Sequence, residues 1–149
     1  MNFPDPNLPP FVIVDDSEDD AFLLRYRLRQ GGIANPVVSF TDPVAAREYV
    51  AASYIVNAPP QLLFVDIRMA GGYNLIAELR EDARFDDTRI VVFTYSNDPL
   101  DVKRGLQMRI DGYILKFPDP DILAEFVAHG PWFEISRPRP EAKRHVLCA

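Results

Sequence analysis

Four apolar residues in a row end at a single aspartate in Leu62-Leu63-Phe64-Val65-Asp66-Ile67-Arg68-Met69, the stretch that decides the fold. A short apolar run bounded by turn residues is typical of a strand buried on both faces, as the strands of parallel sheets are. Asp66 then lies at the carboxyl end of its strand, the edge at which open α/β sheets bind ligands. Taken alone, Asp66 is explained equally well as a cap of the next helix, because aspartate is a preferred capping residue.

The alternation of a short apolar run with a helical segment recurs along the whole chain. Capping residues such as Ser17 and Asp42 precede the helical segments and offer acceptors to their free N–H groups. Five such units predict an α/β fold, an open, doubly wound, five-stranded parallel sheet with helices on both faces. The predicted strands start at residues 11, 37, 61, 89 and 113, and the predicted helices follow Ser17 and cover 44–52, 75–79, 100–108 and 120–128.

The bulk properties agree with one globular domain and exclude several functions. The 149 residues are 48% hydrophobic and 26% charged, as in ordinary soluble proteins. A net charge of -6 disfavours nucleic-acid binding, which needs a basic surface. No apolar stretch approaches the length of a membrane span and no signal segment opens the chain, which predicts a cytoplasmic location and no membrane partner. Cys148 is the only cysteine, so no intrachain disulfide can form.

Five polar residues follow four of the predicted strands: Asp15, Asp16, Asp66, Thr94 and Lys116. If those strands are adjacent, their carboxyl ends place these side chains in one crevice. Three carboxylates this close repel one another unless a cation joins them, and oxygen ligands of this kind suit Mg²⁺. Asp66 could then attack phosphorus and form an aspartyl phosphate, while Lys116 neutralises phosphoryl oxygens. Each residue alone has a simpler explanation as a cap or a solvated charge.

Four motifs carry a resemblance to a known family. They are Val12-Ile13-Val14-Asp15-Asp16, the stretch from Leu63 to Met69, Ile90-Val91-Val92-Phe93-Thr94 and Asp111-Gly112-Tyr113-Ile114-Leu115-Lys116. In order and spacing they resemble the receiver domain of two-component response regulators. The resemblance implies a flavodoxin-like sheet with strand order 2-1-3-4-5. It divides the chain into an extended lead-in (1–9), a receiver domain (10–130) and a C-terminal extension or arm (131–149).

The resemblance also assigns the transfer chemistry to particular residues. Asp66 is implied to be the phosphoacceptor, and Lys116 to pair with the phosphoryl group. Mg²⁺ is implied to bind Asp15, Asp16, Asp66 and the backbone carbonyl of Arg68.

Further residues match the switch and tuning positions of the family. Thr94 is implied to be the switch hydroxyl, and Tyr113 the switch aromatic, whose ring moves inward when Thr94 is drawn to the phosphate. Arg68 and Ser96 lie two residues beyond Asp66 and Thr94, at positions that tune the lifetime of the phosphoryl group. For Arg68, a solvated arginine with no such task is an equally good interpretation.

The chain departs from the family at the rim of this site. Ala70 replaces the usual proline, and the following turn is about two residues shorter when aligned on the next helix. Tyr95 stands where a small residue is usual, and its ring could narrow access to the site. Phe117 follows Lys116 in place of a proline. A cis bond before a non-proline costs about 3 kcal/mol, so we predict a trans peptide between them unless the loop forces the cis form.

The implied function is that of a single-domain response regulator in a two-component phosphorelay. It would accept a phosphoryl group on Asp66 from a sensor histidine kinase or a histidine phosphotransfer protein, and signal by a conformational change. Phytochrome-type kinases are candidate partners, because some single-domain receivers paired with them have a similar layout. Self-catalysed transfer and dephosphorylation would be its only chemistry, so it is not predicted to be an enzyme.

Two other functions remain open. One is a pseudo-receiver, a protein-binding module in which Tyr95 and the altered Lys116 loop prevent phosphorylation. The other is a Mg²⁺-dependent phosphohydrolase that forms an aspartyl phosphate. Arg68 argues against it, since haloacid-dehalogenase-type enzymes keep a second acidic residue at that position.

The C-terminal segment suggests a second copy of the chain as a partner. Trp132-Phe133-Glu134-Ile135 is an apolar stretch outside the βα pattern, and tryptophan is a common interface anchor. The segment could fold back over the domain, end as a frayed terminus, or form an arm that contacts a second copy. On the last interpretation we expect a homodimer formed through the fifth strand, the fourth helix or the arm 131–149.

Overall fold

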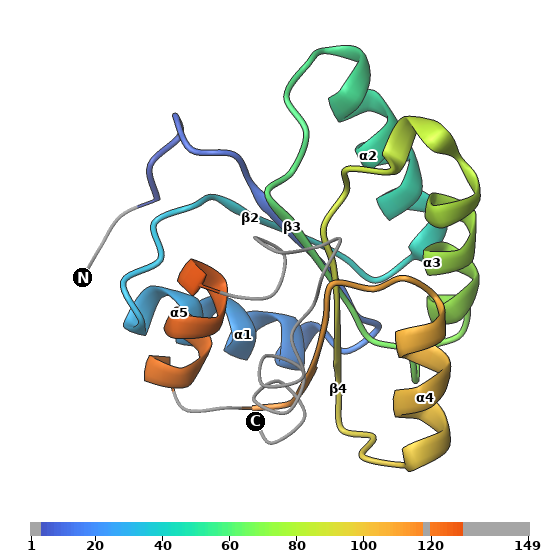
Figure 1. The fold of residues 1–149 in the computed structure, drawn as a ribbon. Coiled ribbons are helices and arrows are strands. Elements are labelled where there is room, and N and C mark those ends of the chain that lie inside the picture. The colour runs from blue at the N-terminus through green and yellow to red at the C-terminus, as the bar shows by residue number, and fades with distance from the viewer. Residues whose placement is uncertain (1–3, 118–119, 130–149) are drawn as a thin grey trace.

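The computed structural model describes residues 4–117 and 120–129. Within them the chain forms a parallel sheet covered by helices (Figure 1). The predicted α/β class is therefore confirmed, and each predicted strand is present to within one residue of its expected start. The strands are β1 (Phe11–Val14), β2 (Val37–Phe40), β3 (Leu62–Val65), β4 (Ile90–Thr94) and β5 (Gly112–Leu115).

The sheet order is β2-β1-β3-β4-β5, as the resemblance implied. All neighbouring strands are parallel, and β1, β3 and β4 are fully buried. The two edge strands are less covered: β2 is partly exposed, and Leu115 at the end of β5 is partly buried. Full burial on both faces explains why the other strands are continuous apolar runs rather than alternating ones.

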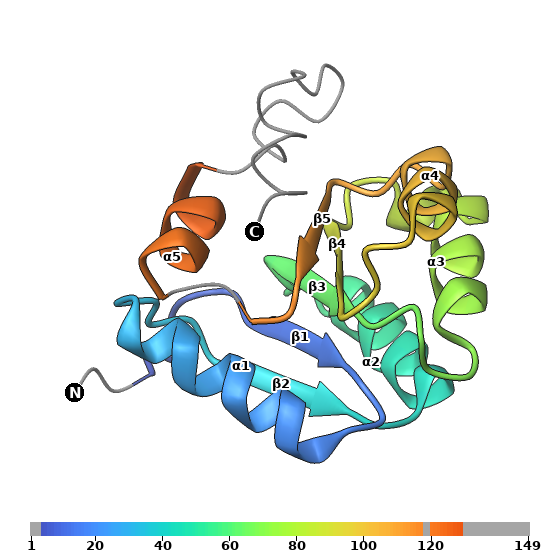
Figure 2. The ribbon, with the colours of Figure 1, turned by 90° about the horizontal axis from the view of Figure 1, so that it is seen from below.

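Helices cover both faces of this sheet, as predicted. Figure 2 shows α1 and α5 on one side of the strands and α2, α3 and α4 on the other. Within the described residues, no helix has the length and apolar character that a bilayer crossing requires. The helices are α1 (Glu18–Gln30), α2 (Pro43–Ile55), α3 (Gly72–Glu81), α4 (Pro99–Gln107) and α5 (Pro120–His129), and a short 3-10 helix, η1, covers Ala83–Phe85.

Strand register brings the polar residues of β1 and β3 to the same level. Val14 pairs with Val65, and the Asp66 N–H donates to the Val14 carbonyl at 3.0 Å, so the two following aspartates lie side by side. On the other side, Thr94 pairs with Leu115, and the Lys116 N–H donates to the Thr94 carbonyl at 2.9 Å. The backbone ladder itself therefore places the candidate residues at one edge.

The lead-in before β1, residues 4–10, packs at the amino-terminal ends of the strands, away from the candidate residues. The Asp5 N–H donates to the Ala34 carbonyl at 2.8 Å, and the Asn35 side chain donates to the Pro9 carbonyl at 2.8 Å. The Gln61 N–H donates to the Pro10 carbonyl just before β3 begins. Residues 4–10 form no helix or strand, but they are tied to the amino-terminal ends of the strands.

A buried ion pair joins α3 to the start of β5. Arg80 Nη2 lies 3.1 Å from Asp111 Oδ2, and the same oxygen accepts the Ile90 N–H at 2.7 Å. Burial raises the pKa of Asp111 although this N–H and Arg80 oppose the effect. Because each partner would be costly to bury alone, this pair fixes α3 against the amino ends of β4 and β5.

Candidate functional site

Three carboxylates meet at the carboxyl ends of β1 and β3. One oxygen from each of Asp15, Asp16 and Asp66 lies within 4.8 Å of the others. Asp15 is 1% exposed and Asp66 is 7% exposed, whereas Asp16 is open to solvent. The structure thus brings together the three acidic residues that the sequence predicted, and Asp16 keeps one side of the cluster exposed to solvent.

Each buried carboxylate uses one oxygen to fix its own turn. Asp15 Oδ1 accepts the Ser17 N–H at 2.9 Å, and Asp66 Oδ1 accepts the Arg68 N–H at 2.9 Å. Asp66 does not cap the next helix, because the N-cap of α3 is Gly71. The simple capping interpretation of Asp66 is therefore wrong, and its second oxygen remains free for other partners.

Those second oxygens are joined by Lys116. Its ammonium lies 2.6 Å from Asp15 Oδ2 and 3.0 Å from Asp66 Oδ2, and the Lys116 side chain is 1% exposed. A third carboxylate, Asp20 on α1, also contacts it at 3.0 Å. Burial alone would lower the pKa of Lys116, but the hydrogen bonds that it donates to the three carboxylates raise that pKa above its ordinary value. Lys116 is therefore a fixed positive charge.

The chemistry of these side chains fits a divalent cation. Four aspartates face a single ammonium here, so negative charge is in excess. Burial raises the pKa of Asp15, although Lys116 and the Ser17 N–H oppose that effect. Clustered carboxylate oxygens that keep a solvent-facing side are the setting in which Mg²⁺ binds. The part assigned to the Arg68 carbonyl stays a prediction.

The two residues that the resemblance implies are a switch, Thr94 and Tyr113, lie on the neighbouring strands β4 and β5. Thr94 is fully buried at the end of β4, and its hydroxyl is 3.4 Å from the Ser96 N–H. Tyr113 on β5 is 1% exposed, so its ring points into the protein, and its hydroxyl donates to the Ser96 carbonyl at 2.7 Å. The segment after β4 is thus held by both residues that the resemblance identified as a switch.

Arg68 and Ser96, which the resemblance implies tune the phosphoryl lifetime, meet at a carboxylate that the sequence did not indicate. Asp101 on α4 accepts from the Ser96 hydroxyl at 2.5 Å and from Arg68 Nη1 at 3.3 Å. It also accepts from the Tyr73 hydroxyl of α3 at 2.9 Å. Hydrogen bonds from Ser96 and Tyr73 lower the pKa of Asp101. Asp101 therefore links the loops after β3 and β4 to α4.

Three aromatic rings, those of Phe93, Tyr95 and Phe117, pack around Lys116. The Phe117 ring packs edge-on against Phe93 and Tyr95, at centroid distances of 5.4 and 5.8 Å. The Lys116–Phe117 peptide is cis, so the predicted trans bond is wrong. The prediction named a constraint from the loop as the exception, and here both side chains are fixed by tertiary contacts, Lys116 on the carboxylates and Phe117 on the rings.

Sequence reasoning missed Asp20 and Asp101 for a common reason. Each lies in the first turn of a helix, where an acidic residue already has a sufficient explanation in the helix dipole. Their contacts come from residues far away in the sequence, on β5 for Asp20 and after β4 for Asp101. For Asp20 the sequence did offer one signal: it lies in the first turn of the helix that follows Asp15 and Asp16, which places it near that pair.

Comparison with known proteins places this site in context. The family model described as "Response regulator receiver domain" matches residues 11–128. The transcriptional regulatory protein BaeR of Escherichia coli O6:H1 (strain CFT073) is 32% identical over 114 residues, which cover 75% of this chain and 43% of BaeR. The chain thus spans less than half the length of this curated relative.

Two solved structures share the fold. The phosphorylated cyanobacterial phytochrome response regulator RcpA has a TM-score of 0.66 and 22% identity, covering 80% of this chain and 88% of that chain. The Mn²⁺-bound form of response regulator Rcp1 has a TM-score of 0.63 and 22% identity, covering 80% of this chain and 89% of that one. At this level of identity the likeness shows the fold alone.

Proposed function

Because the chain belongs to the response regulator receiver domain family, we propose that it is a single-domain response regulator of a two-component phosphorelay, with Asp66 as its phosphoacceptor. One observation carries the proposal: Lys116 bridges Asp15 and Asp66, the buried carboxylates that end two adjacent strands. In such a cluster an aspartate can act as the nucleophile towards phosphorus, and the ammonium can neutralise charge on the phosphoryl oxygens.

The proposed reaction starts from a phosphohistidine of a sensor histidine kinase or a histidine phosphotransfer protein. An oxygen of Asp66 forms a bond to phosphorus while the nitrogen–phosphorus bond breaks. The electron pair of that bond stays on the imidazole, which takes up a proton from solvent. The product is an acyl phosphate on Asp66, and its hydrolysis returns inorganic phosphate and the free carboxylate.

The residues of this chain neutralise and orient the transferred group. Lys116 is positively charged and lies against Asp66, so it can donate to a phosphoryl oxygen. The Thr94 hydroxyl can donate to another. Mg²⁺ held by Asp15, Asp16, Asp66 and the Arg68 carbonyl would supply further positive charge to the phosphoryl oxygens. In this proposal the chain catalyses only the phosphorylation and dephosphorylation of its own Asp66.

The signal leaves the site through the segment after β4. Thr94 and Tyr113 both contact Ser96, and Ser96 contacts Asp101 on α4. A Thr94 hydroxyl drawn to the phosphoryl group would release the Ser96 N–H and shift this segment. The outcome is a changed surface of α4 and β5, which we propose as the output of the protein.

The proposal extends to partners and location. The fold shared with the phytochrome response regulator RcpA supports a phytochrome-type kinase as one candidate donor. We place the protein in the cytoplasm, where such donors present their phosphohistidine. A homodimer through β5, α4 or the segment 131–149 belongs to the same proposal, and the solution molar mass tests it. The predicted arm itself lies outside the described residues.

Acetyl phosphate with Mg²⁺, followed by intact-protein mass spectrometry, tests the phosphoacceptor. We expect one phosphoryl group on the wild-type chain and none on Asp66→Asn. Asp42→Asn is the matched control, because asparagine caps a helix as well as aspartate does and Asp42 caps α2 away from the cluster. A wild-type chain that gains no mass, or an adduct that persists in Asp66→Asn, contradicts the proposal.

The enclosure of Lys116 favours one alternative, a pseudo-receiver that binds its partner without phosphorylation. The Lys116 side chain is 1% exposed, and the Tyr95 ring centroid lies 4.9 Å from its ammonium. If this alternative is correct, the wild-type chain gains no phosphoryl group and Asp66→Ala binds the partner normally.

A further inference from the structure

Lys116 has one carboxylate partner that the proposed reaction does not use. Asp20 lies on α1, outside the group of three aspartates that could share a metal ion among the described residues. Its Oδ2 is nevertheless 3.0 Å from the Lys116 ammonium, the same distance as Asp66 Oδ2. Asp20 therefore competes with the phosphoacceptor for the same cation.

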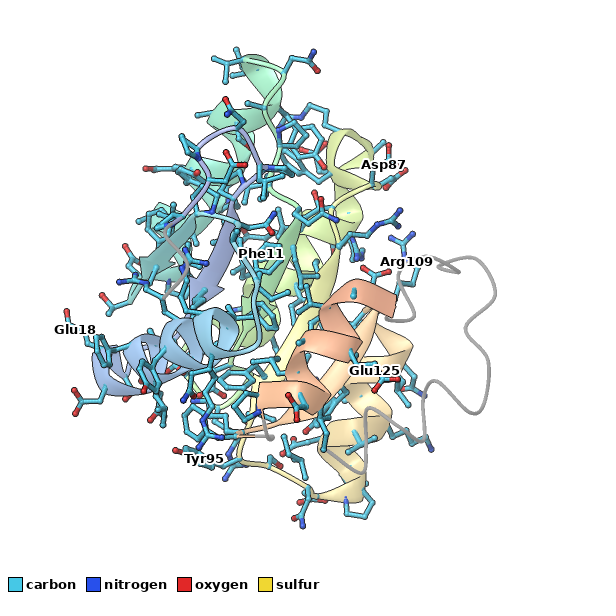
Figure 3. The ribbon with its side chains drawn as sticks, turned by 90° about the vertical axis from the view of Figure 1, so that its left-hand side faces the viewer. Phe11, Glu18, Asp87, Tyr95, Arg109 and Glu125 are labelled. Carbon is cyan, nitrogen blue, oxygen red and sulfur yellow. The ribbon has the colours of Figure 1, made fainter. Side chains whose placement is uncertain are left out.

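Tyr95 holds Asp20 in this position. The Tyr95 hydroxyl donates to Asp20 Oδ1 at 3.3 Å, and the Tyr95 ring centroid lies 4.9 Å from the Lys116 ammonium. Asp20, Tyr95 and Lys116 thus form a closed set of mutual contacts at the rim, where Tyr95 is 61% exposed. Figure 3 shows Tyr95 beside α1.

The number of donors on Lys116 limits what it can bind at one time. A lysine ammonium has three N–H donors, and Asp15, Asp20 and Asp66 each accept from it. To donate to a phosphoryl oxygen, Lys116 must release one of the three. Asp20 has a side chain that is 20% exposed, against 1% for Asp15 and 8% for Asp66, so water can replace the ammonium most easily at Asp20.

On the basis of the proposed function, we propose that Asp20 is a positioning residue that holds Lys116 in the resting site and is exchanged for a phosphoryl oxygen when Asp66 is phosphorylated. Asp20 thereby sets the affinity of the site for the phosphoryl group. The negative charge of Asp20 also opposes binding of the phosphoryl group, because it repels an anion at Asp66. Asp20 and Asp66 each lie 3.0 Å from one nitrogen, so their oxygens are no more than about 6 Å apart, within the range of unscreened repulsion.

Binding of beryllium fluoride, a mimic of the phosphoryl group, tests this role without turnover. The dissociation constant is measured at saturating Mg²⁺ by fluorine-19 NMR for the wild-type chain and for Asp20→Asn. We expect Asp20→Asn to bind about three- to tenfold more tightly, because one competing charge close to the anion is removed. Its labelling by acetyl phosphate should be faster by a similar factor.

Three variants separate positioning from general charge. Asp19→Asn removes the same charge from the same turn of α1 and should bind like the wild-type chain. Asp20→Glu keeps the carboxylate and should restore the wild-type affinity. Tyr95→Phe removes only the hydroxyl that holds Asp20, and should tighten binding by less than Asp20→Asn does.

The outcomes distinguish this inference from the proposed function. If the wild-type chain binds beryllium fluoride and Asp20→Asn binds equally well or more weakly, Asp20 does not compete for Lys116 and the inference is overturned, while the phosphoacceptor site stands. If Asp19→Asn tightens binding as much as Asp20→Asn does, the effect is general charge and the inference is also overturned. A wild-type chain that binds no beryllium fluoride at any Mg²⁺ concentration overturns both.

Discussion

At the scale of single residues, Asp101 shows how a carboxylate outside the reaction can organise the site. It accepts hydrogen bonds from Ser96, Arg68 and Tyr73, which belong to two loops and a helix. The Arg104 guanidinium lies 3.7 Å from the centroid of the Tyr73 ring, so Tyr73 is also held from α4. Tyr73 thus joins α3 to α4 through both its hydroxyl and its ring.

Tyr73→Phe should reveal this link through the pH dependence of stability. Burial and the hydrogen bond to Asp101 raise the pKa of Tyr73 from 10.0 to about 12. A raised pKa means that the folded state keeps the Tyr73 proton to a higher pH than the unfolded state does. The contribution of Tyr73 to the free energy of unfolding is therefore complete below pH 10 and is lost as the pH rises towards 12. We expect Tyr73→Phe to lower the free energy of unfolding by about 1 kcal/mol at neutral pH.

Urea unfolding between pH 7 and 12 measures this effect. The difference between the wild-type chain and Tyr73→Phe should shrink as the pH rises from 10 to 12. Tyr26→Phe serves as the control, since Tyr26 is 50% exposed on α1, away from Asp101. A difference that is constant with pH would show that the Tyr73 hydroxyl does not interact with a charged Asp101.

The sequence predicted the residues whose place follows from strand order, and missed those whose place follows from helix packing. Asp15, Asp66 and Lys116 each end a strand, so the topology alone brings them together. Asp20 and Asp101 reach their partners only because α1 and α4 pack at particular rotations beside the sheet. An apolar pattern gives the face that a helix buries, but not which of its polar residues reaches the rim.

At the scale of elements, the turn between β3 and α3 sets the position of Asp66. Gly71 has φ of 84°, a left-handed conformation that favours glycine, and it caps α3. A Cβ added to Gly72 would meet the Asp66 carbonyl oxygen and, at 3.1 Å, the Ile67 Cα. Both neighbours are backbone atoms, so α3 can start this close to the strand end only because residue 72 has no side chain.

Gly72→Ala is therefore expected to damage stability and metal binding together. The backbone of Asp66 must move to admit the methyl group, which should cost about 1–3 kcal/mol, as overpacking does in other cores. The same movement displaces the Asp66 carboxylate from Asp15, so the affinity for Mg²⁺ should fall. Thermal unfolding and calorimetric titration with Mg²⁺ measure the two effects.

Gly32→Ala separates backbone strain from contact with the site. Gly32 also has a positive φ, of 85°, but no atom lies within 4 Å of the added Cβ. We expect this variant to lose stability by about 1 kcal/mol from the left-handed conformation alone and to bind Mg²⁺ normally. Normal Mg²⁺ binding by Gly72→Ala as well would mean that the turn does not position Asp66.

Element boundaries were predicted less well than element types. α2 runs to Ile55, beyond the predicted end at Ala52, and α3 begins at Gly72 rather than near Leu75. Glycine is a poor helix former, so sequence propensity placed Gly72 in the turn. In the folded chain its N–H donates to the Met69 carbonyl, and packing beside Asp66 determines where the helix starts.

At the scale of the whole molecule, metal binding is expected to raise stability. The chain has a net charge of -6, and two of the three carboxylates of its acidic cluster are buried. A ligand that binds only the folded state stabilises it in proportion to the logarithm of its concentration. Mg²⁺ should therefore raise the unfolding temperature, and chelation by EDTA should remove the gain.

The expected size of this gain follows from linkage. At a Mg²⁺ concentration ten times the dissociation constant, the free energy of unfolding should rise by about 1.4 kcal/mol. Asp15→Asn should abolish most of the rise, because it removes a buried ligand of the cluster. NaCl at matched ionic strength controls for general screening. An equal rise in NaCl, or in Asp15→Asn, would show that Mg²⁺ does not bind at this edge.

The lead-in before β1 has a practical consequence for measuring such interactions on a sensor surface. Residues 4–10 are tied to the amino-terminal ends of the strands, whereas Asp66 and Lys116 lie past the carboxyl ends, a full strand away. A tether attached at the exposed Pro6–Leu8 turn would therefore anchor the molecule with its reactive edge turned to the flowing solution. Immobilisation through α4 would instead bury part of the α4 and β5 surface that we propose as the output.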